Sequence, residues 1–120
     1  MVITAMTDDS ITAPAPDAPR VLVVDPNRRV RTALVELLRL LGMRVVEAAE
    51  IDGAQQAVHD LHPTVAVVDG RLSDRAHAGI QAAHALLEAD PSLRVIVYTA
   101  EHDADLQPRV LAAGVFAYLP

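Results

Sequence analysis

Two aspartates and a threonine each stand at the end of a short apolar run, which makes them the first candidates for chemistry. Asp25 follows "VLVV", Asp69 ends "TVAVVD", and Thr99 lies near the end of "RVIVYTA". Two carboxylates and a hydroxyl can hold a hard cation such as Mg²⁺, which prefers oxygen ligands and keeps several waters. One carboxylate can also form an acyl phosphate when a cation neutralises the phosphoryl oxygens. These residue types indicate a metal-assisted phosphoryl site, provided that the fold brings them together.

The same acids have a second interpretation as helix caps. An acid after a strand can accept hydrogen bonds from the first-turn N–H groups of the next helix, and for either acid alone this is the commoner role. For the set of three the balance reverses, because Asn27 is the better-placed cap after the first run and Gly70 directly follows Asp69. We therefore interpret Asp25, Asp69 and Thr99 as one site.

Five apolar runs and four helical segments alternate along the chain and must position these residues. Strands are predicted at 21–24, 43–48, 64–69, 94–100 and 115–119, and helices at 28–42, 52–63, 80–90 and 103–114. Gly42 stands where a helix C-cap belongs, and Pro63 and Pro91 end the next two helices. Pro108 is tolerable if the first turn of the last helix starts near Leu106. The apolar positions at helical spacing in the first helix are Val30, Leu34, Leu37, Leu38 and Leu41.

Strands that alternate with helices through short connections must run parallel, with right-handed crossovers, so we expect an open, doubly wound α/β sheet. In such sheets ligands bind outside the carboxyl ends of the strands, which would gather the two acids and Thr99 in one cleft. Residues 1–19 are rich in Ala, Thr, Asp and Pro and show no periodicity. They are predicted to be a flexible leader before a single domain at 20–120.

The composition narrows the class of partners. Sixteen acids against ten bases give a net charge of −6, which repels phosphate backbones and argues against direct nucleic acid binding. The chain has no cysteine, which excludes thiol catalysis and zinc–thiolate sites, and all its bases are arginine. No apolar stretch reaches the roughly 18 residues of a membrane span, and no export signal precedes the domain, so a cytoplasmic protein is expected.

Four motifs, in the order "VLVVDPN", "VAVVDGRLS", "VIVYTAE" and "AAGVFAYL", resemble those of the receiver domain of bacterial two-component response regulators. The resemblance covers about residues 20 to 120. It implies a flavodoxin-like sheet with strand order 2-1-3-4-5, and a phosphoryl group taken from a sensor histidine kinase or phosphotransfer protein. It also implies a protein that is not an enzyme, since receiver domains only assist their own phosphotransfer and dephosphorylation.

The resemblance assigns roles to five residues of this chain. Asp69 matches the phosphoacceptor, and Asp25 matches the first acid of a metal-binding pair. Arg71 matches the position whose backbone carbonyl binds the metal. Thr99 matches the switch hydroxyl, and Tyr118 matches the aromatic that changes rotamer on the signalling surface.

The chain departs from the family pattern in three places. Pro26 replaces the second acid and offers no side-chain oxygen, so Mg²⁺ binding is expected to be weak. The family's lysine would fall after Pro120, and the chain contains no lysine. The family's fifth helix is also missing. We therefore expect a receiver truncated before its last helix, with an output domain beyond residue 120. Alternatively, a partner such as a second copy would cover the exposed flank of the sheet.

Two other functions are compatible with the sequence. The first is an atypical receiver that works as a phosphorylation-independent interaction or dimerisation module with an impaired Mg²⁺ site, which Pro26 favours. The second is a flavodoxin-like binder of a small molecule or nucleotide. It has less support, because no glycine-rich phosphate loop follows the first strand.

Overall fold

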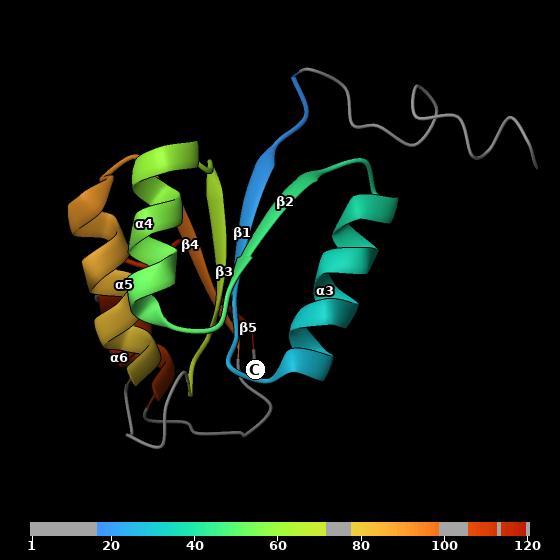
Figure 1. The fold of residues 1–120 in the computed structure, drawn as a ribbon. Helices are drawn as coiled ribbons and strands as arrows, with labels where there is room; N and C mark the ends of the chain where they lie inside the picture. The colour runs from blue at the N-terminus through green and yellow to red at the C-terminus, as the bar shows by residue number, and fades with distance from the viewer. Residues whose placement is uncertain (1–16, 72–77, 99–105, 113, 120) are drawn as a thin grey trace, which may run out of the picture.

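The fold is a five-stranded parallel sheet with helices on both faces (Figure 1). The structure, a computed structural model, describes residues 17–71, 78–98, 106–112 and 114–119. The strands are β1 (Arg20–Val24), β2 (Arg44–Ala48), β3 (Val65–Asp69), β4 (Arg94–Tyr98) and β5 (Ala117–Leu119), and the helices are α3 (Arg28–Leu40), α4 (Ile51–Leu61), α5 (Ala78–Ala89) and α6 (Leu106–Ala112). The strand order is β2-β1-β3-β4-β5, which confirms the predicted flavodoxin-like topology.

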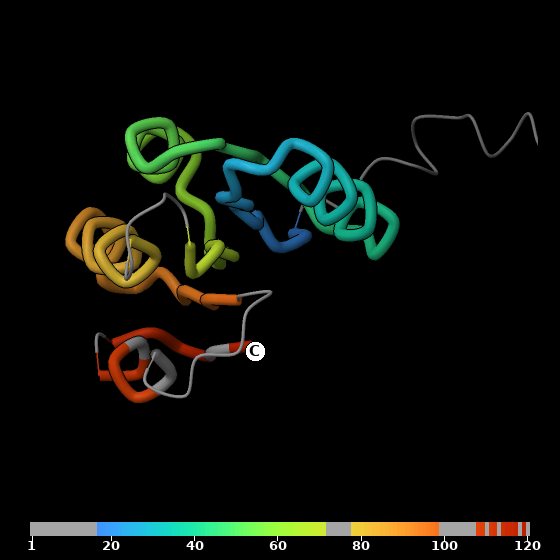
Figure 2. The backbone as a smooth tube through the Cα atoms, turned by 90° about the horizontal axis from the view of Figure 1, so that it is seen from below, coloured from blue at the N-terminus to red at the C-terminus, as the bar shows by residue number. Residues whose placement is uncertain are grey.

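The sheet separates two apolar cores. In the larger one, alternate residues of the central strands, such as Leu22, Val68 and Val97, pack against α4 and α5. The smaller one joins Val21 and Val23 of β1 to α3. Figure 2 shows the three layers end-on, with α4, α5 and α6 on one side of the sheet and α3 on the other. Because β1 is buried on both faces, its sequence is a continuous apolar run and does not alternate.

Helix α3 packs on a narrower stripe than its sequence predicts. Val35 is buried, and Leu34 and Leu38 pack beside it against the sheet. The other three predicted apolar positions, Val30, Leu37 and Leu41, are exposed instead, and Leu37 retains 53% of its surface. Successive residues of a helix are rotated by about 100°, so a stripe centred on Val35 and Leu38 turns the predicted flank away from the sheet.

Most of the predicted helix ends agree with the structure. Asn27 caps α3, since its side chain accepts the N–H groups of Arg29 at 3.0 Å and Val30 at 3.1 Å. Gly42 follows the C-cap with a φ of +87°, a conformation that favours glycine. Helix α4 ends at Leu61, before Pro63, and Pro108 lies in the first turn of α6. Helix α5 begins at Ala78, two residues before its predicted start.

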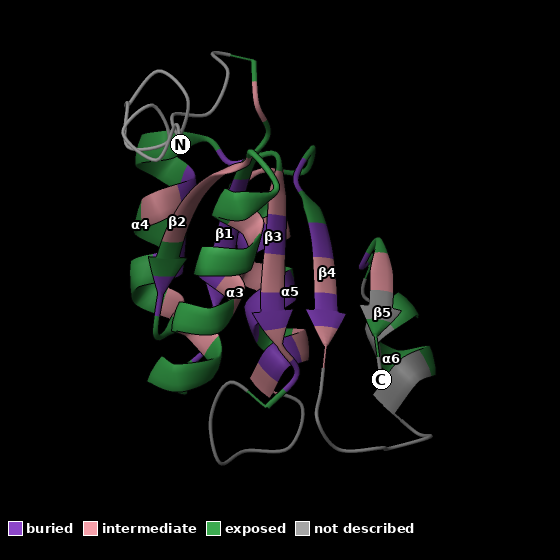
Figure 3. Cartoon of the chain, turned by 90° about the vertical axis from the view of Figure 1, so that its right-hand side faces the viewer, coloured by how far each residue is buried: buried purple, intermediate pink, exposed green. Residues whose placement is uncertain are grey.

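The sheet face that α3 covers is less enclosed than the opposite face. Val67 of β3 and Ile96 of β4 lie on the α3 side and are only partly buried, whereas their neighbours Val68 and Val97 are fully buried (Figure 3). Part of this flank is therefore accessible along the middle of β3 and β4. None of the helices in the described ranges is long and apolar enough to cross a membrane.

Of the predicted leader, residues 17–19 belong to the described part of the chain, and they are tied to the sheet. The Arg44 N–H donates to the Pro19 carbonyl at 2.9 Å, and the Arg44 guanidinium donates to the Ala18 carbonyl at 3.2 Å. The start of β2 therefore holds the residues just before β1. The leader and the boundary at residue 20 stay predictions.

Candidate functional site

Three polar side chains form a row across the carboxyl ends of the central strands. Asp25 directly follows β1, Asp69 ends β3, and Tyr98 ends β4. Val24 pairs with Val68, and Asp69 pairs with Tyr98, so the three residues occupy neighbouring positions in the parallel register. Because side chains alternate along a strand, all three project from the face that α3 covers. The structure thus brings together the two predicted acids and adds a tyrosine that the sequence analysis did not single out.

Asp25 is a buried carboxylate whose polar atoms all have partners. It retains 2% of its surface. Its Oδ1 accepts the Asn27 N–H at 2.8 Å, and its Oδ2 accepts the Tyr98 hydroxyl. The backbone N–H donates to the Ala48 carbonyl at 3.1 Å, and the backbone carbonyl accepts from Arg31 Nη1 at 2.8 Å. Burial of polar groups is costly unless hydrogen bonds compensate it, and the Asn27 and Tyr98 bonds do so for the carboxylate, while the other two do so for the backbone.

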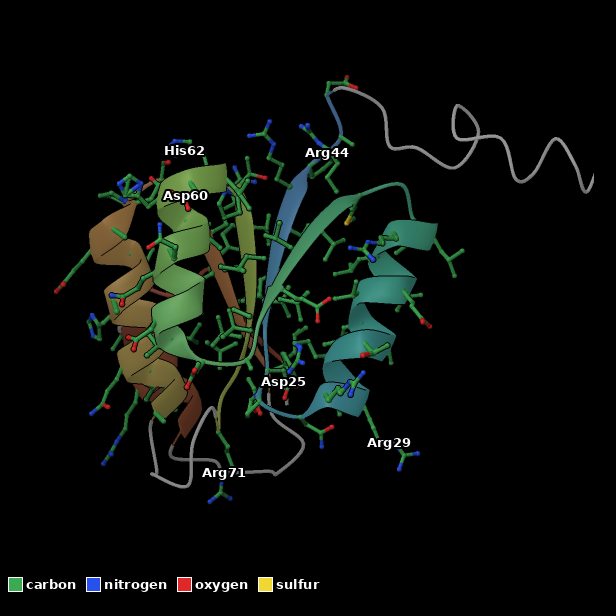
Figure 4. All side chains as sticks on the ribbon, in the orientation of Figure 1. Asp25, Arg29, Arg44, Asp60, His62 and Arg71 are labelled. Carbon is green, nitrogen blue, oxygen red and sulfur yellow. The ribbon has the colours of Figure 1, made fainter. Side chains whose placement is uncertain are left out.

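One arginine at the start of α3 takes part in the site. Arg31 donates from Nη1 to the Asp25 carbonyl and from Nε to Glu47 Oε1 at 2.9 Å, and so links α3 to the end of β1 and to β2. Arg28 and Arg29 are exposed, as expected for a solvated helix face, and Figure 4 shows Arg29 directed away from the sheet. Arg31 therefore has a structural role, since it supports the segment that carries Asp25.

Asp69 is half-buried and interacts electrostatically with Asp25. Its pKa is raised, chiefly because burial disfavours the charged carboxylate, and also because Asp25 lies near it. The Arg71 N–H, which donates to Asp69 Oδ1 at 3.0 Å, and the Arg71 charge oppose this rise. Figure 4 shows Asp25 and Arg71 at the same end of the sheet. The site thus contains an unusually basic carboxylate beside a fully buried one.

Two glycines bring α5 against the strand end that carries Asp69. The Gly70 N–H donates to the Tyr98 carbonyl at 2.6 Å, and the Gly79 N–H donates to the Gly70 carbonyl at 3.2 Å. A Cβ added to Gly79 would lie 2.5 Å from Gly70 Cα and 2.7 Å from the Asp69 carbonyl oxygen. Only glycine allows this approach, so Gly79 sets the distance between α5 and the Asp69 turn.

The two predicted switch residues lie wholly or partly outside the described residues. Thr99 lies outside the described residues. Tyr118 lies in β5, where its backbone pairs with Val97 of β4, while its side chain is outside the described set. Their roles stay predictions.

The oxygen atoms at this edge suit a hydrated hard cation. Asp25 and Asp69 supply carboxylates, and the Arg71 carbonyl follows Asp69 by two residues. Pro26 is exposed and contributes no side-chain oxygen, and within the described ranges no three His, Cys, Asp or Glu side chains form a metal-ligand cluster. Mg²⁺ keeps several waters and needs only one or two carboxylates, so the residues present fit it with one charged ligand fewer than the family's acidic pair would supply.

Comparison with known proteins assigns this chain to a family. Residues 21–120 match the model of the response regulator receiver domain. The response regulator GacA of Pseudomonas protegens is 32% identical over 103 residues, which cover 83% of this chain and 47% of the relative. A LuxR-family two-component response regulator from Aurantimonas sp. SI85-9A1 is 26% identical, with a TM-score of 0.75, over 85% of this chain and 73% of that one.

A further solved structure shares the fold. It is a response regulator from Burkholderia pseudomallei with a phosphorylated aspartic acid, a calcium ion and citrate, and it is 23% identical with a TM-score of 0.76 over 84% of this chain and 58% of that one. The chain spans about half the length of the curated relatives it matches.

The fold and the family match define a receiver domain of the two-component class. The chain belongs to the response regulator receiver domains. This assignment favours phosphoryl acceptance on an aspartate over the phosphorylation-independent module and over a small-molecule binder.

Proposed function

We propose that Asp69 accepts the phosphoryl group in this receiver domain. The observation that carries the proposal is the placement of Asp69. It ends β3 with its carboxylate half-buried, its pKa raised, and a second carboxylate beside it. Of the two acids, Asp25 is buried and hydrogen-bonded through both oxygens, whereas Asp69 is partly accessible. An incoming phosphoryl group therefore reaches Asp69 first.

The transfer follows from ordinary carboxylate chemistry. An Asp69 carboxylate oxygen attacks the phosphorus of a phosphohistidine, the new P–O bond forms an acyl phosphate, and the P–N bond breaks with its electron pair left on the histidine nitrogen. The ionised carboxylate is the nucleophile, and a raised pKa makes it more basic than an ordinary aspartate. The Arg71 N–H orients one oxygen of Asp69.

The negative charge that accumulates in this site requires compensation. We propose that Asp25, Asp69 and the Arg71 carbonyl hold Mg²⁺ weakly, because Pro26 removes a charged ligand. When bound, the cation would neutralise the negative charge of the phosphoryl oxygens and so reduce their repulsion by the two carboxylates. The phosphorylated aspartic acid and calcium ion of the Burkholderia pseudomallei response regulator support this proposal.

We further propose that Thr99 and Tyr118 pass the change to a signalling surface. Phosphorylation would favour one of two existing arrangements by making different contacts with each, which is the usual basis of a population shift. The proposed donor is a sensor histidine kinase or a phosphotransfer protein in the cytoplasm. The roughly doubled length of the relatives supports an output domain beyond residue 120, and a homodimer is a second way to cover the open flank of the sheet.

Mass spectrometry tests the acceptor directly. The chain is incubated with acetyl phosphate or phosphoramidate and millimolar Mg²⁺, and we expect a mass gain of one phosphoryl group. Asp69→Asn should abolish the gain. Asp52→Asn, which alters an exposed acid on α4, should keep it. No gain with the fold intact, in this chain and in a longer one that supplies the lysine, would contradict the proposal.

A further inference from the structure

Of the three polar side chains at the carboxyl ends of the central strands, Tyr98 is the one that the proposed reaction does not use. Its hydroxyl donates to Asp25 Oδ2 and so occupies the carboxylate oxygen that the Asn27 N–H leaves available. The bond links residues 73 positions apart in sequence. The contact therefore restrains the Asp25 side chain from a strand that is distant in sequence.

The sheet topology shows where the phenol must lie. Tyr98 ends β4 and Asp25 follows β1, and β3 runs between these strands. Neighbouring strands lie about 4.8 Å apart, so the tyrosine side chain crosses the end of β3, where Asp69 is its register partner. The pKa of Tyr98 is raised, chiefly because burial disfavours the phenolate, and also by its hydrogen bond to Asp25 and the charges of both aspartates, which agrees with this position. The phenol therefore reaches Asp25 across the strand end that carries Asp69.

The side chains of Pro26 and Arg31 do not compete with Tyr98 for Asp25 Oδ2. Pro26 is exposed and has neither a side-chain donor nor a side-chain oxygen at the site. Arg31 reaches the Asp25 backbone carbonyl, and its Nε pairs with Glu47. Of the two hydrogen bonds to the Asp25 carboxylate in the described part of the chain, one comes from the Tyr98 side chain and the other from the Asn27 backbone.

We propose that Tyr98 is a latch on the acceptor site: its hydroxyl holds Asp25 away from cations, and the phenol must release Asp25 before a cation or phosphoryl group can settle between Asp25 and Asp69. The inference rests on the proposed function of Asp69. Tyr98 acts through Asp25 and is therefore a positioning residue. Its chemistry is that of a hydrogen-bond donor which competes with a divalent cation for one carboxylate oxygen.

Cation binding tests the latch without any reaction. In Tyr98→Phe the ring stays and only the hydroxyl is lost, and isothermal titration calorimetry with Mg²⁺ should show a Kd lower by roughly tenfold, the equivalent of about 1.4 kcal/mol, the size of a typical net hydrogen bond. Thr64→Val is the matched control, because it removes a hydroxyl that donates to the Arg20 carbonyl at the opposite end of β3. Its Mg²⁺ affinity should equal that of the wild type.

An unchanged or weaker Mg²⁺ affinity in folded Tyr98→Phe would overturn the latch. If this variant does not fold, the ring-carbon NMR signals of labelled wild-type tyrosines decide the question. The Tyr98 signal should shift as Mg²⁺ is added, and saturation without a shift would overturn the proposal as well.

The outcomes separate the latch from the proposed function. Tighter Mg²⁺ binding in Tyr98→Phe, with no phosphoryl mass gain in either protein or in the longer chain, would support the latch and contradict Asp69 as acceptor. A phosphoryl gain in the wild type, with equal Mg²⁺ affinities, would support the acceptor and overturn the latch.

Discussion

The close approach of α5 to the Asp69 turn predicts an unusual effect of a single methyl group. In an ordinary helix, Gly→Ala stabilises the protein by up to about 1 kcal/mol, because alanine has the higher helix propensity. At Gly79 the new Cβ would lie 2.5 Å from Gly70 Cα and 2.7 Å from the Asp69 and Gly70 carbonyl oxygens. All three atoms belong to the backbone, so no side-chain rotation can relieve the contact.

The two contributions can be compared. Overpacking of this kind costs about 1–3 kcal/mol, and the propensity gain offsets at most about 1 kcal/mol of it. Because the contacts at 2.5 and 2.7 Å are with backbone atoms, the cost lies in the upper part of that range, and we expect Gly79→Ala to lose roughly 1–2 kcal/mol of unfolding free energy. For a domain near this size each kcal/mol lowers Tm by about 4–8 °C, so the loss is measurable by thermal or urea denaturation.

Gly53→Ala in α4 is the matched control. A Cβ at Gly53 would lie 3.6 Å from Ala48 Cβ, which is an ordinary contact, so this variant should be slightly stabilised. Because the methyl at Gly79 presses on the Asp69 turn, Gly79→Ala should also shift the Gly70 amide signal in NMR spectra and slow phosphoryl gain. If Gly79→Ala matches or exceeds the wild type in stability, the inferred packing of α5 on the Asp69 turn is wrong.

Four further changes test the site and its supports. The raised pKa of Asp69 means that the folded state binds its proton more tightly than the unfolded state, so this residue lowers stability as pH rises through its folded pKa. Asp69→Asn should be more stable than the wild type at neutral pH, and denaturation curves should converge below about pH 3; a constant difference would contradict the raised pKa. Asn27→Ala removes the α3 cap and should cost about 1 kcal/mol in urea denaturation, whereas an unaltered midpoint would show that the cap is dispensable. Gly42→Ala forces a side chain into a φ of +87° and should cost about 1–2 kcal/mol, which the same measurement checks. Pro26→Asp restores a carboxylate beside Asp25 and should tighten Mg²⁺ binding in calorimetry, and an equal Kd would show that these acids are not the ligands.

Much of the fold could be predicted because it depends on local patterns. Apolar runs and proline or glycine stops indicate strands and helices wherever the chain places them, and short connections between parallel strands restrict the topology. The same logic located Asp25 and Asp69 together, because the carboxyl ends of parallel strands share one edge. Asn27 and Gly42 were predictable for the same reason, since a cap depends on only a few adjacent residues.

The rest required the tertiary structure. Which stripe of α3 faces the sheet depends on how the whole helix rests on β1 and β2, and Leu37 shows that spacing alone does not determine it. In the sequence Tyr98 is simply the end of an apolar strand, and Gly79 is one glycine after a loop. Their roles arise because register aligns β4 with β3, and because α5 approaches the Asp69 turn within van der Waals distance. The sequence alone determined which acids stand at the edge of the sheet, whereas long-range packing decided what holds them there.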